Sequence, residues 1–331
     1  EEIMRIDGLD NVDIPATISI APSVETLSHE VAYSEKVAGS LAGLGFREIF
    51  TNSITNSAYY SEGVLKNTVK MINNLSEELN VMRPAMMETG LESIAYNLNR
   101  KNSDLKFFEF GKTYLVDENG RYAENNHLAL YVTGYTSGQG WKEKARRADF
   151  YYLKAVLEKI IRLAGLNPEG YKQVESEGLS DSLEVLIQKE PVAQIGMVSP
   201  QKLERFDIKQ PVLYADLDWD KLLALNRKAV IEYREISKYP AVNRDLAIVV
   251  DKPLPYDAVE KAALAAGIKK LKSISLFDIF ESEKIGAGKK SMAVSFTFQD
   301  VEKTLTDKEI DGMMNRIIAS FEKELNAEIR K

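Results

Sequence analysis

The sequence predicts an α+β protein built from two successive domains, and three observations carry this prediction. The chain has 331 residues, which is more than one hydrophobic core usually organises. A long β-hairpin pattern with its own glycine-rich connection runs from Lys272 to Phe298. A helix pattern followed by a glycine and a strand pattern opens the other end, from Ser28 to Ile54.

The hairpin near the C-terminus is the clearest single signal. Its arms are 272–280 and 289–298, and Gly286-Ala287-Gly288 lies in the connection, where glycine tolerates positive φ. The second arm alternates polar and apolar residues throughout. The first arm alternates only as far as Phe277, and after that an aromatic side chain and a carboxylate follow one another.

The flanks of this hairpin supply the elements that would cover one face of it, since two strands alone are marginally stable. The pattern predicts a strand at 244–251, a helix at 256–266, a helix at 306–325 and a short strand at 327–330. Asp307 and Glu309 favour the start of the second helix, because the helix dipole attracts negative charge there. The resulting order, βαββαβ, is the ferredoxin-like arrangement.

The first two thirds of the chain predict a mostly antiparallel sheet with helices, an α+β layer. The apolar stripe of 28–44 predicts a helix that Gly45 ends, and 46–54 then predicts a strand. Further predicted elements are a short helix through Ile6, a helix at 86–99, and strands at 105–115, 127–135, 182–188, 191–198 and 211–218. Phe107, Phe108 and Phe110 are interpreted as core residues, as are Met82, Met86 and Met87.

Composition excludes several classes of function. The chain has no run of about 18 apolar residues, so no membrane partner is predicted. It has no cysteine, which permits the reducing cytoplasm and removes disulfides and thiolate metal sites. It starts at Glu1 without an initiator methionine or a signal peptide, and we expect a piece of a longer protein.

Charge alone ranks nucleic-acid binding low, and no DNA partner is predicted. The net charge is -7. From Ser237 onward there are 16 Lys and Arg against 15 Asp and Glu, and the preceding residues hold 27 against 35. The basic run 142–147 could contact an RNA backbone, but a solvated loop and helix start is the preferred interpretation.

Motifs for catalysis are missing from the sequence. Three Gly-x-Gly sequences begin at Gly43, Gly138 and Gly286, and Glu48, Glu143 and Ser291 stand where a dinucleotide fingerprint needs its third glycine. The sequence also has no phosphate-binding P-loop motif and no Gly-x-Ser-x-Gly elbow, and its two histidines lie far apart. We therefore predict that this chain carries no catalytic residues.

Short motifs from Ser237 onward resemble a known family in order and spacing. They are Lys238-Tyr239-Pro240, Arg244-Asp245-Leu246, Leu276-Phe277-Asp278, Gly288-Lys289-Lys290-Ser291 and Thr304-Leu305-Thr306-Asp307-Lys308-Glu309. Together they resemble the ferredoxin-fold anticodon-binding domain of bacterial phenylalanyl-tRNA synthetase beta subunits. Upstream, Val81-Met82-Arg83-Pro84 and Phe107-Phe108-Glu109-Phe110-Gly111 are similar to the catalytic-like module of that subunit.

The resemblance implies three segments and a class II synthetase-like fold for the largest. It places the tail of a preceding small domain at 1–20, the catalytic-like module without an active site at 21–232, and the anticodon-binding domain at 237–331. The helix 28–44 and strand 46–54 are similar to motif 1 of class II synthetases, which builds a subunit interface. Their usual proline at the strand end is missing here.

Carried over residue by residue, the resemblance implies that Asp278, Phe280, Ser291 and Arg330 bind RNA and that Glu1 and Glu2 help hold Mg²⁺. It implies a cytoplasmic α2β2 phenylalanine-tRNA ligase in which the alpha subunit binds ATP and the beta subunit contacts phenylalanine tRNA. The family commonly has tyrosine where Phe280 stands. The alternative is a stand-alone RNA-binding or assembly module without synthetase activity.

Overall fold

The structure is a computed structural model that describes residues 1–13, 16, 17, 19, 28–74, 76–138, 140–227, 233, 235–282, 285, 286 and 288–330. The chain forms two compact units, Glu1–Val230 and Ile231–Lys331. The predicted bridge at 229–236 and the predicted boundary between residues 20 and 21 lie mainly outside the described residues. Within the described part of the chain, no helix combines the length and the apolar character needed to cross a membrane.

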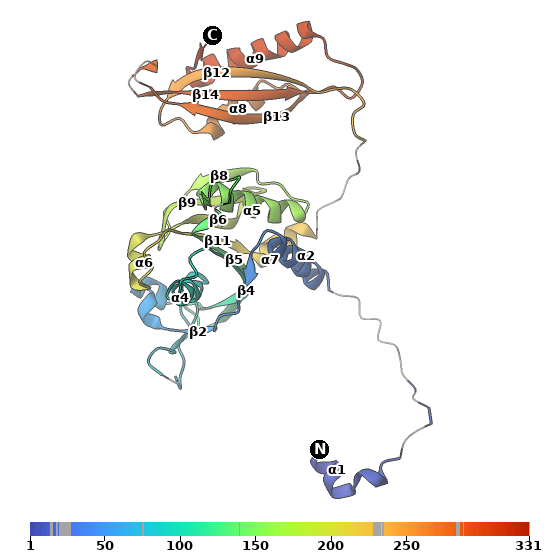
Figure 1. Cartoon of the computed structure of the whole chain (residues 1–331), viewed down its shortest axis with the longest axis vertical. Coiled ribbons are helices and arrows are strands. Elements are labelled where there is room, and N and C mark those ends of the chain that lie inside the picture. The colour runs from blue at the N-terminus through green and yellow to red at the C-terminus, as the bar shows by residue number, and fades with distance from the viewer. Residues whose placement is uncertain are drawn as a thin grey trace. The chain divides into compact units, whose positions relative to one another are not determined.

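The first unit is organised by a seven-stranded sheet (Figure 1) with the order β1-β4-β5-β11-β10-β9-β8. Its neighbouring strands pair antiparallel except β1 with β4, which pair in parallel. The bounds are β1 Arg47–Glu48, β4 Leu105–Val116, β5 Tyr122–Thr133, β8 Gly170–Gln173, β9 Leu179–Ile187, β10 Glu190–Val198 and β11 Val212–Asp218. The predicted α+β layer with a mostly antiparallel sheet is therefore confirmed.

Helices cover both faces of this sheet. On one face, α2 (His29–Gly43), α5 (Phe150–Leu163) and α7 (Trp219–Asn226) share a core with the strands. On the other face, α4 (Met87–Leu98) and α6 (Pro200–Arg205) pack into a second core. Successive residues of β11 alternate between the two cores, as expected for a strand buried on both sides.

Small elements complete the first unit. They are α1 (Glu2–Asp7), α3 (Glu62–Leu65), β2 (Ile54–Thr55), β3 (Val81–Met82), β6 (Tyr135–Ser137), β7 (Arg146–Arg147) and the 3-10 turns Leu9–Asn11 and Ser57–Tyr59. The strand pair β2-β3 and the hairpin β6-β7 form separate two-stranded sheets outside the large sheet.

The predicted strand 46–54 is wrong in its middle. It divides into β1 and β2, and the connecting Phe50 is 96% exposed. The chain leaves the sheet because Thr51 is held elsewhere: its backbone N–H and its hydroxyl both donate to the buried carboxylate of Glu109. One buried acceptor thus outweighs the strand propensity of the segment. The structure also adds α7, which the sequence pattern did not predict.

The second unit confirms the predicted ferredoxin-like order. Its strands are β12 (Val242–Asp251), β13 (Leu271–Phe280), β14 (Lys289–Phe298) and β15 (Glu328–Arg330), in the sheet order β13-β14-β12-β15. Its helices are α8 (Tyr256–Ala265) and α9 (Asp307–Leu325). Gly286 and Gly288 take positive φ of 119° and 81° in the hairpin connection.

The start of α9 shows why the chain turns there. The backbone N–H of Thr306 donates to the carboxylate of Glu309 at 3.0 Å, which closes the first turn of the helix. A hydrogen bond from Lys303, with further bonds from Thr306, lowers the pKa of Glu309 to about 2. The predicted acidic helix start is confirmed at this residue.

Candidate nucleic-acid interface

One face of the second unit's sheet is covered and the other is left open to a ligand. Both α8 and α9 pack into a single core with the inward side chains of β14, which are Met292, Val294, Phe296 and Phe298. The alternating outward positions of β14 are Ser291, Ala293, Ser295 and Thr297, which are small. We call this outward surface the open face. Its small side chains let a ligand approach the sheet closely.

A β-bulge at Phe277 decides which side chains of β13 reach the open face. Leu276 lies opposite the inward Val294, but the next paired residue, Asp278, lies opposite the outward Ala293. Phe277 is the extra residue between these pairs. Without it, strict alternation would turn Asp278 and Phe280 toward the helices. The bulge therefore turns both side chains outward, and this is the point where the sequence alternation breaks.

The four residues predicted to bind RNA lie on this face. Phe280 pairs directly with Ser291, and Asp278 pairs with Ala293 two positions along the strand. Arg330 in β15 pairs with Ala247 of β12, and the strands β12 and β14 lie between β15 and β13. Its guanidinium carbon nevertheless lies 6.0 Å from the centre of the Phe280 ring. The arginine side chain therefore extends over the strands between them.

Exposure differs among the four residues, and Ser291 alone is buried in the free protein. Phe280 is 48% exposed, so a ring face is available for stacking. Ser291 is 4% exposed and lies in the floor of the site. The carboxylate of Asp278 makes no hydrogen bond or ion pair with any residue that the structure describes, and its hydrogen-bond acceptors are free for a ligand.

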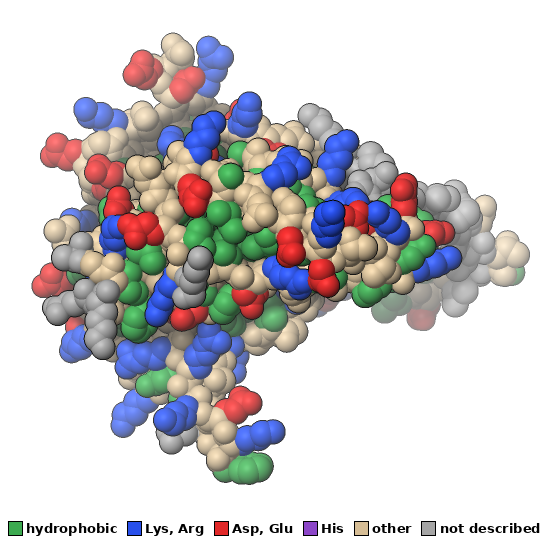
Figure 2. Space-filling view, turned by 90° about the horizontal axis from the view of Figure 1, so that it is seen from above, with side chains coloured by type: hydrophobic (Ala, Val, Ile, Leu, Met, Phe, Trp, Pro, Cys, Tyr) green, Lys and Arg blue, Asp and Glu red, His purple; other side chains and the backbone are tan. Residues whose placement is uncertain are grey.

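Two lysines at this end of the hairpin, Lys252 and Lys289, are already paired. Lys289 forms an ion pair with Glu328, whose hydrogen bond raises the lysine pKa, and Lys252 lies 2.6 Å from Glu281. Figure 2 shows that basic and acidic side chains are interspersed across the whole face in view. Charge alone does not make this surface an RNA site. Stacking and hydrogen bonding have to supply the recognition.

Glu1 and Glu2, the predicted metal ligands, lie at the start of α1. Their side chains are 82% and 80% exposed, and both form ion pairs with Arg5, at 3.2 and 3.6 Å. Mg²⁺ requires six oxygen ligands in near-octahedral geometry. In the described part of the chain, no group of three or more candidate metal ligands gathers. Two exposed carboxylates do not form a complete site, and their role stays a prediction.

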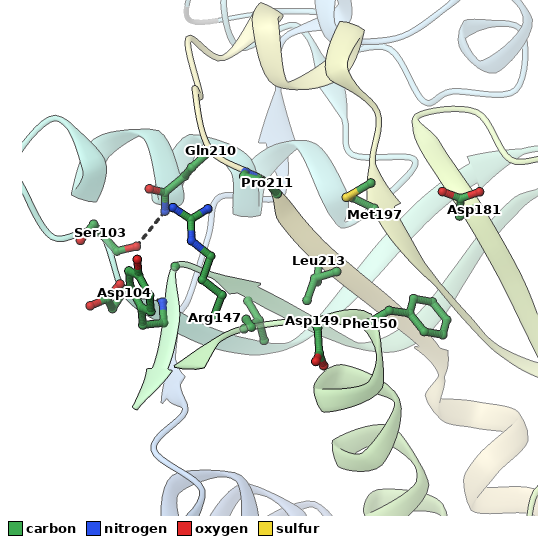
Figure 3. A pocket seen from close by; sticks show the side chains of 14 residues that line it. Ser103, Asp104, Arg147, Asp149, Phe150, Asp181, Met197, Gln210, Pro211 and Leu213 are labelled. Atoms are coloured by element: carbon green, nitrogen blue, oxygen red, sulfur yellow. Dashed lines mark hydrogen bonds between the residues drawn. The ribbon is translucent and has the colours of Figure 1, made fainter. Parts of the chain in front are cut away.

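The first unit contains a cavity of about 510 Å³ beside the β6-β7 hairpin (Figure 3). Val132, Met197 and Leu213 give it an apolar floor, and its polar lining includes three aspartates. Arg147 extends from β7 toward Gln210, which donates to the carbonyl of Ser103 at 2.7 Å. Asp149 caps α5 by accepting from the Tyr152 N–H. This lining does not favour a nucleotide phosphate, because aspartates outnumber the single arginine.

The strands β4, β5 and β11 bring together three residues that resemble a hydrolase triad. The Thr113 hydroxyl lies 2.9 Å from His127 Nε2, and His127 Nδ1 lies 2.8 Å from Asp216. Thr113 is 2% exposed, so no substrate can reach its hydroxyl. The arrangement is structural, and sequence spacing gave no signal for it, since the residues are far apart in the chain.

Two buried ion pairs on the α4 face were also missed by sequence reasoning. Arg83 and Glu109 lie 2.9 Å apart with side chains 3% and 1% exposed. Lys202 and Glu88 lie 2.6 Å apart with side chains 9% and 4% exposed. Such pairs hold elements together only while both partners remain. They lie on the α4-covered side of the large sheet, where each cation is paired with a carboxylate and only Oε2 of Glu88 is buried without a hydrogen-bond partner among the described residues.

Comparison with known proteins identifies both units. The family described as phenylalanyl tRNA synthetase beta chain CLM domain matches residues 14–219, and the ferredoxin-fold anticodon binding domain matches residues 237–330. Phenylalanine–tRNA ligase beta subunits of Bacteroides fragilis and Bacteroides thetaiotaomicron are 40% and 41% identical over the whole chain.

The chain spans 42% of the length of these curated relatives. A solved pyrrolysyl tRNA synthetase from Desulfitobacterium hafniense aligns with 62% of this chain and 72% of its own, at a TM-score of 0.49 and 19% identity. The two family matches and the two relatives agree along the sequence. This chain belongs to the phenylalanyl-tRNA synthetase beta chain family.

Proposed function

We propose that this chain is the C-terminal part of the beta subunit of a cytoplasmic α2β2 phenylalanine-tRNA ligase and that its second unit reads the anticodon of phenylalanine tRNA. The observation that carries the proposal is the open face, where Asp278, Ser291 and Arg330 lie near the exposed ring of Phe280. The match of residues 237–330 to an anticodon-binding domain supports the same assignment.

Each of the four side chains has a distinct task in this proposal. Phe280 stacks on an unstacked base, which contributes roughly 1–3 kcal/mol per base. Asp278 accepts hydrogen bonds from the donor edge of guanine, and Ser291 both donates and accepts. Arg330 pairs with a phosphate or extends the stack. None of these tasks requires a strongly basic surface.

The contact between Arg330 and Phe280 indicates what happens when RNA arrives. In the free protein the guanidinium lies 6.0 Å from the ring centre. A cation over an exposed ring contributes about 0.5–1 kcal/mol. A base stacked on the same ring contributes roughly 1–3 kcal/mol. The base therefore displaces the guanidinium, and Arg330 is released toward the phosphate of the bound nucleotide.

The first unit acts as a scaffold for the catalytic alpha subunit in this proposal. Thr113 of its triad-like residues is buried, and the cations of its two buried ion pairs, Arg83 and Lys202, are each held by a carboxylate, so the described residues offer no set of groups for adenylation. ATP and Mg²⁺ would bind to the alpha subunit, and α2 would face that partner. Glu1 and Glu2 would contribute to a Mg²⁺ site only with further ligands from outside this chain.

The proposal is tested by salt-titrated binding of this chain to phenylalanine tRNA and to the same tRNA with a scrambled anticodon. Phe280→Ala should weaken binding to the natural anticodon by about 5- to 150-fold, since 1–3 kcal/mol of stacking is removed. The scrambled tRNA should bind the wild type and the variant alike, because charge alone holds it.

Phe277→Ala is the matched control. It removes the same side chain from the neighbouring position, where Phe277 is 59% exposed but lies in the bulge instead of opposite Ser291. Anticodon-dependent binding should survive this change. Equal affinities for both tRNAs in the wild type would overturn the assignment of the open face as the anticodon reader.

A further inference from the structure

The β6-β7 hairpin of the first unit presents an aromatic side chain that the anticodon site does not use. Tyr135 pairs with Arg147 and Ser137 pairs with Arg146 across the hairpin. The backbone N–H of Gly140 donates to the carbonyl of Glu143 at 3.0 Å, which closes a turn with Trp141 and Lys142 at its centre. Trp141 is 98% exposed.

The hairpin is anchored at its base by three hydrogen bonds. Lys106 Nζ donates to the carbonyl of Thr136 at 3.0 Å, and the Thr136 hydroxyl donates to the carbonyl of Arg146 at 3.0 Å. The Ala148 N–H donates to the carbonyl of Gly134 at 2.9 Å where the two strands leave. An exposed tryptophan on an anchored turn offers a large contact area at a small entropic cost.

Three cations of this hairpin have no ion-pair partner among the described residues: Lys142 and Lys144 beside Trp141 in the sequence, and Arg147 at the base of the hairpin. By contrast, Arg146 lies 3.8 Å from Asp149. The cations are concentrated against the local trend, since residues before Ser237 hold 27 Lys and Arg against 35 Asp and Glu. The tip therefore attracts an anionic partner although the chain as a whole is acidic.

Arg147 and Tyr135 extend the same chemistry to the base of the hairpin. The guanidinium carbon of Arg147 lies 5.4 Å from the centre of the Tyr135 ring, and that ring is 37% exposed. An aromatic ring, a planar cation and flexible lysines along one ribbon are the groups that bind single-stranded nucleic acid without reading its sequence.

We propose that the β6-β7 hairpin is a second RNA-binding site that stacks an unpaired base on Trp141 and holds the adjoining phosphates with Lys142 and Lys144. The choice of RNA over an acidic protein rests on the proposed tRNA-binding function and on Trp141, since stacking on a base requires a planar partner. The site binds any unpaired base, because every base has a face that can stack.

Tryptophan fluorescence tests this directly. The chain has two tryptophans, and Trp219 is 3% exposed in the core. The difference in emission between wild type and Trp141→Phe therefore isolates the tip indole. A single-stranded uridine RNA of about 12 nucleotides should quench this difference signal, and an RNA duplex of the same length should not.

Charge reversal at the two lysines beside Trp141 is a second test of the proposed RNA site. Lys142→Glu with Lys144→Glu should weaken binding of the uridine RNA roughly tenfold at low salt and reduce the salt slope by about 0.7 for each phosphate that is no longer neutralised. Lys159→Glu with Lys172→Glu, at two exposed lysines on α5 and β8, is the matched control and should leave both quantities nearly unchanged.

The outcomes separate this proposal from the anticodon assignment. Phe280→Ala should leave the Trp141 quenching intact, and Trp141→Phe should leave the preference for the natural anticodon intact. Absence of quenching by the uridine RNA would overturn the second site. Equal quenching by a polyglutamate peptide of matched charge would also overturn it, because the tip would then recognise an acidic protein instead of a base.

Discussion

The two sheets of this protein differ in how many of their faces are covered. The seven-stranded sheet of the first unit is buried between two cores, one shared with α2, α5 and α7 and one shared with α4 and α6. The four-stranded sheet of the second unit packs α8 and α9 on a single face. The second sheet therefore keeps a surface free for a ligand, while the first uses both surfaces for its own stability.

Polar side chains show what this difference means for function. In the first unit the buried Glu109 and the partly buried His127 and Asp216 are all held by protein partners. In the second unit Asp278 has no hydrogen-bond or ion-pair partner among the described residues. Buried polar groups must be satisfied internally, whereas polar groups on an open sheet can wait for a ligand. The covered sheet is suited to a scaffold and the open sheet to recognition.

The largest expected effect comes from breaking a polar partnership inside the covered sheet. Arg83→Ala leaves the carboxylate of Glu109 buried without its cation, and Arg83 also donates to the carbonyl of Lys112 at 2.7 Å. The free energy of unfolding of the first unit should fall by about 3–5 kcal/mol. Urea unfolding followed by the fluorescence of the buried Trp219 measures this.

The paired replacement sharpens the same test. Arg83→Met combined with Glu109→Leu removes both charges and fills similar volume, so most of the stability should return. A loss of less than about 1 kcal/mol in the free energy of unfolding on Arg83→Ala would contradict this prediction. The pair would then behave like a solvent-exposed ion pair.

A deletion tests the open sheet. Removing Phe277 abolishes the extra residue between the pairs Leu276–Val294 and Asp278–Ala293, so the following side chains move to the opposite face. Anticodon-dependent binding should fall at least as far as in Phe280→Ala, by about 5- to 150-fold. Binding comparable to wild type after the deletion would show that Phe280 does not need the open face.

The covered sheet should also respond to pH through His127. Burial lowers the pKa of His127, but the hydrogen bond and charge of Asp216, with Asp218 and Asp220 nearby, raise it overall above 6.5. The folded state therefore binds the proton more tightly than the unfolded chain. The stabilisation is full below pH 6.5 and is lost as pH rises through the raised pKa.

Urea unfolding at several pH values measures this loss. His127→Gln should make the free energy of unfolding nearly independent of pH between 6.5 and the raised pKa of His127. The other histidine, His29, is exposed at the start of α2, and His29→Gln should leave the slope as in the wild type. A slope that survives His127→Gln would assign the pH dependence to other groups.

The smallest expected effect lies on the open face away from the four site residues. Ser275 is exposed and pairs with Ser295 at the centre of the hairpin. Ser275→Ala should change stability by less than about 0.5 kcal/mol, since it removes no buried contact. Thermal unfolding detects a larger change, which would mean that this face is covered in the folded chain.

Much of the second unit could be predicted from its sequence because its signals are local. The alternation of the hairpin arms, the positive φ of Gly286 and Gly288, and the capping carboxylate of Glu309 all act within a few residues. Interior positions such as Phe107, Phe108 and Met86 were also predicted and are buried. Apolar periodicity reports burial directly, whatever the partner across the core is.

Contacts between distant residues could not be predicted in the same way. The chain Thr113–His127–Asp216 and the pair Arg83–Glu109 depend on which strands lie side by side, and local patterns of polar and apolar residues do not report strand order. Phe50 was predicted inside a strand. The hydrogen bond from the Thr51 N–H to Glu109 takes the chain out of the sheet at this point, and Phe50 is exposed to solvent. At the open face, the irregular alternation after Phe277 was visible, although its effect on the direction of Asp278 was not.

The small hydroxyl side chains of the open face also bear on solubility. A bare sheet face lined by large apolar groups would drive sheets of neighbouring molecules together. Ser273, Ser275, Ser295 and Thr297 are instead small and polar, so their hydration opposes such contact. The hydroxyl side chains therefore lower the tendency of an uncovered sheet to associate through that face.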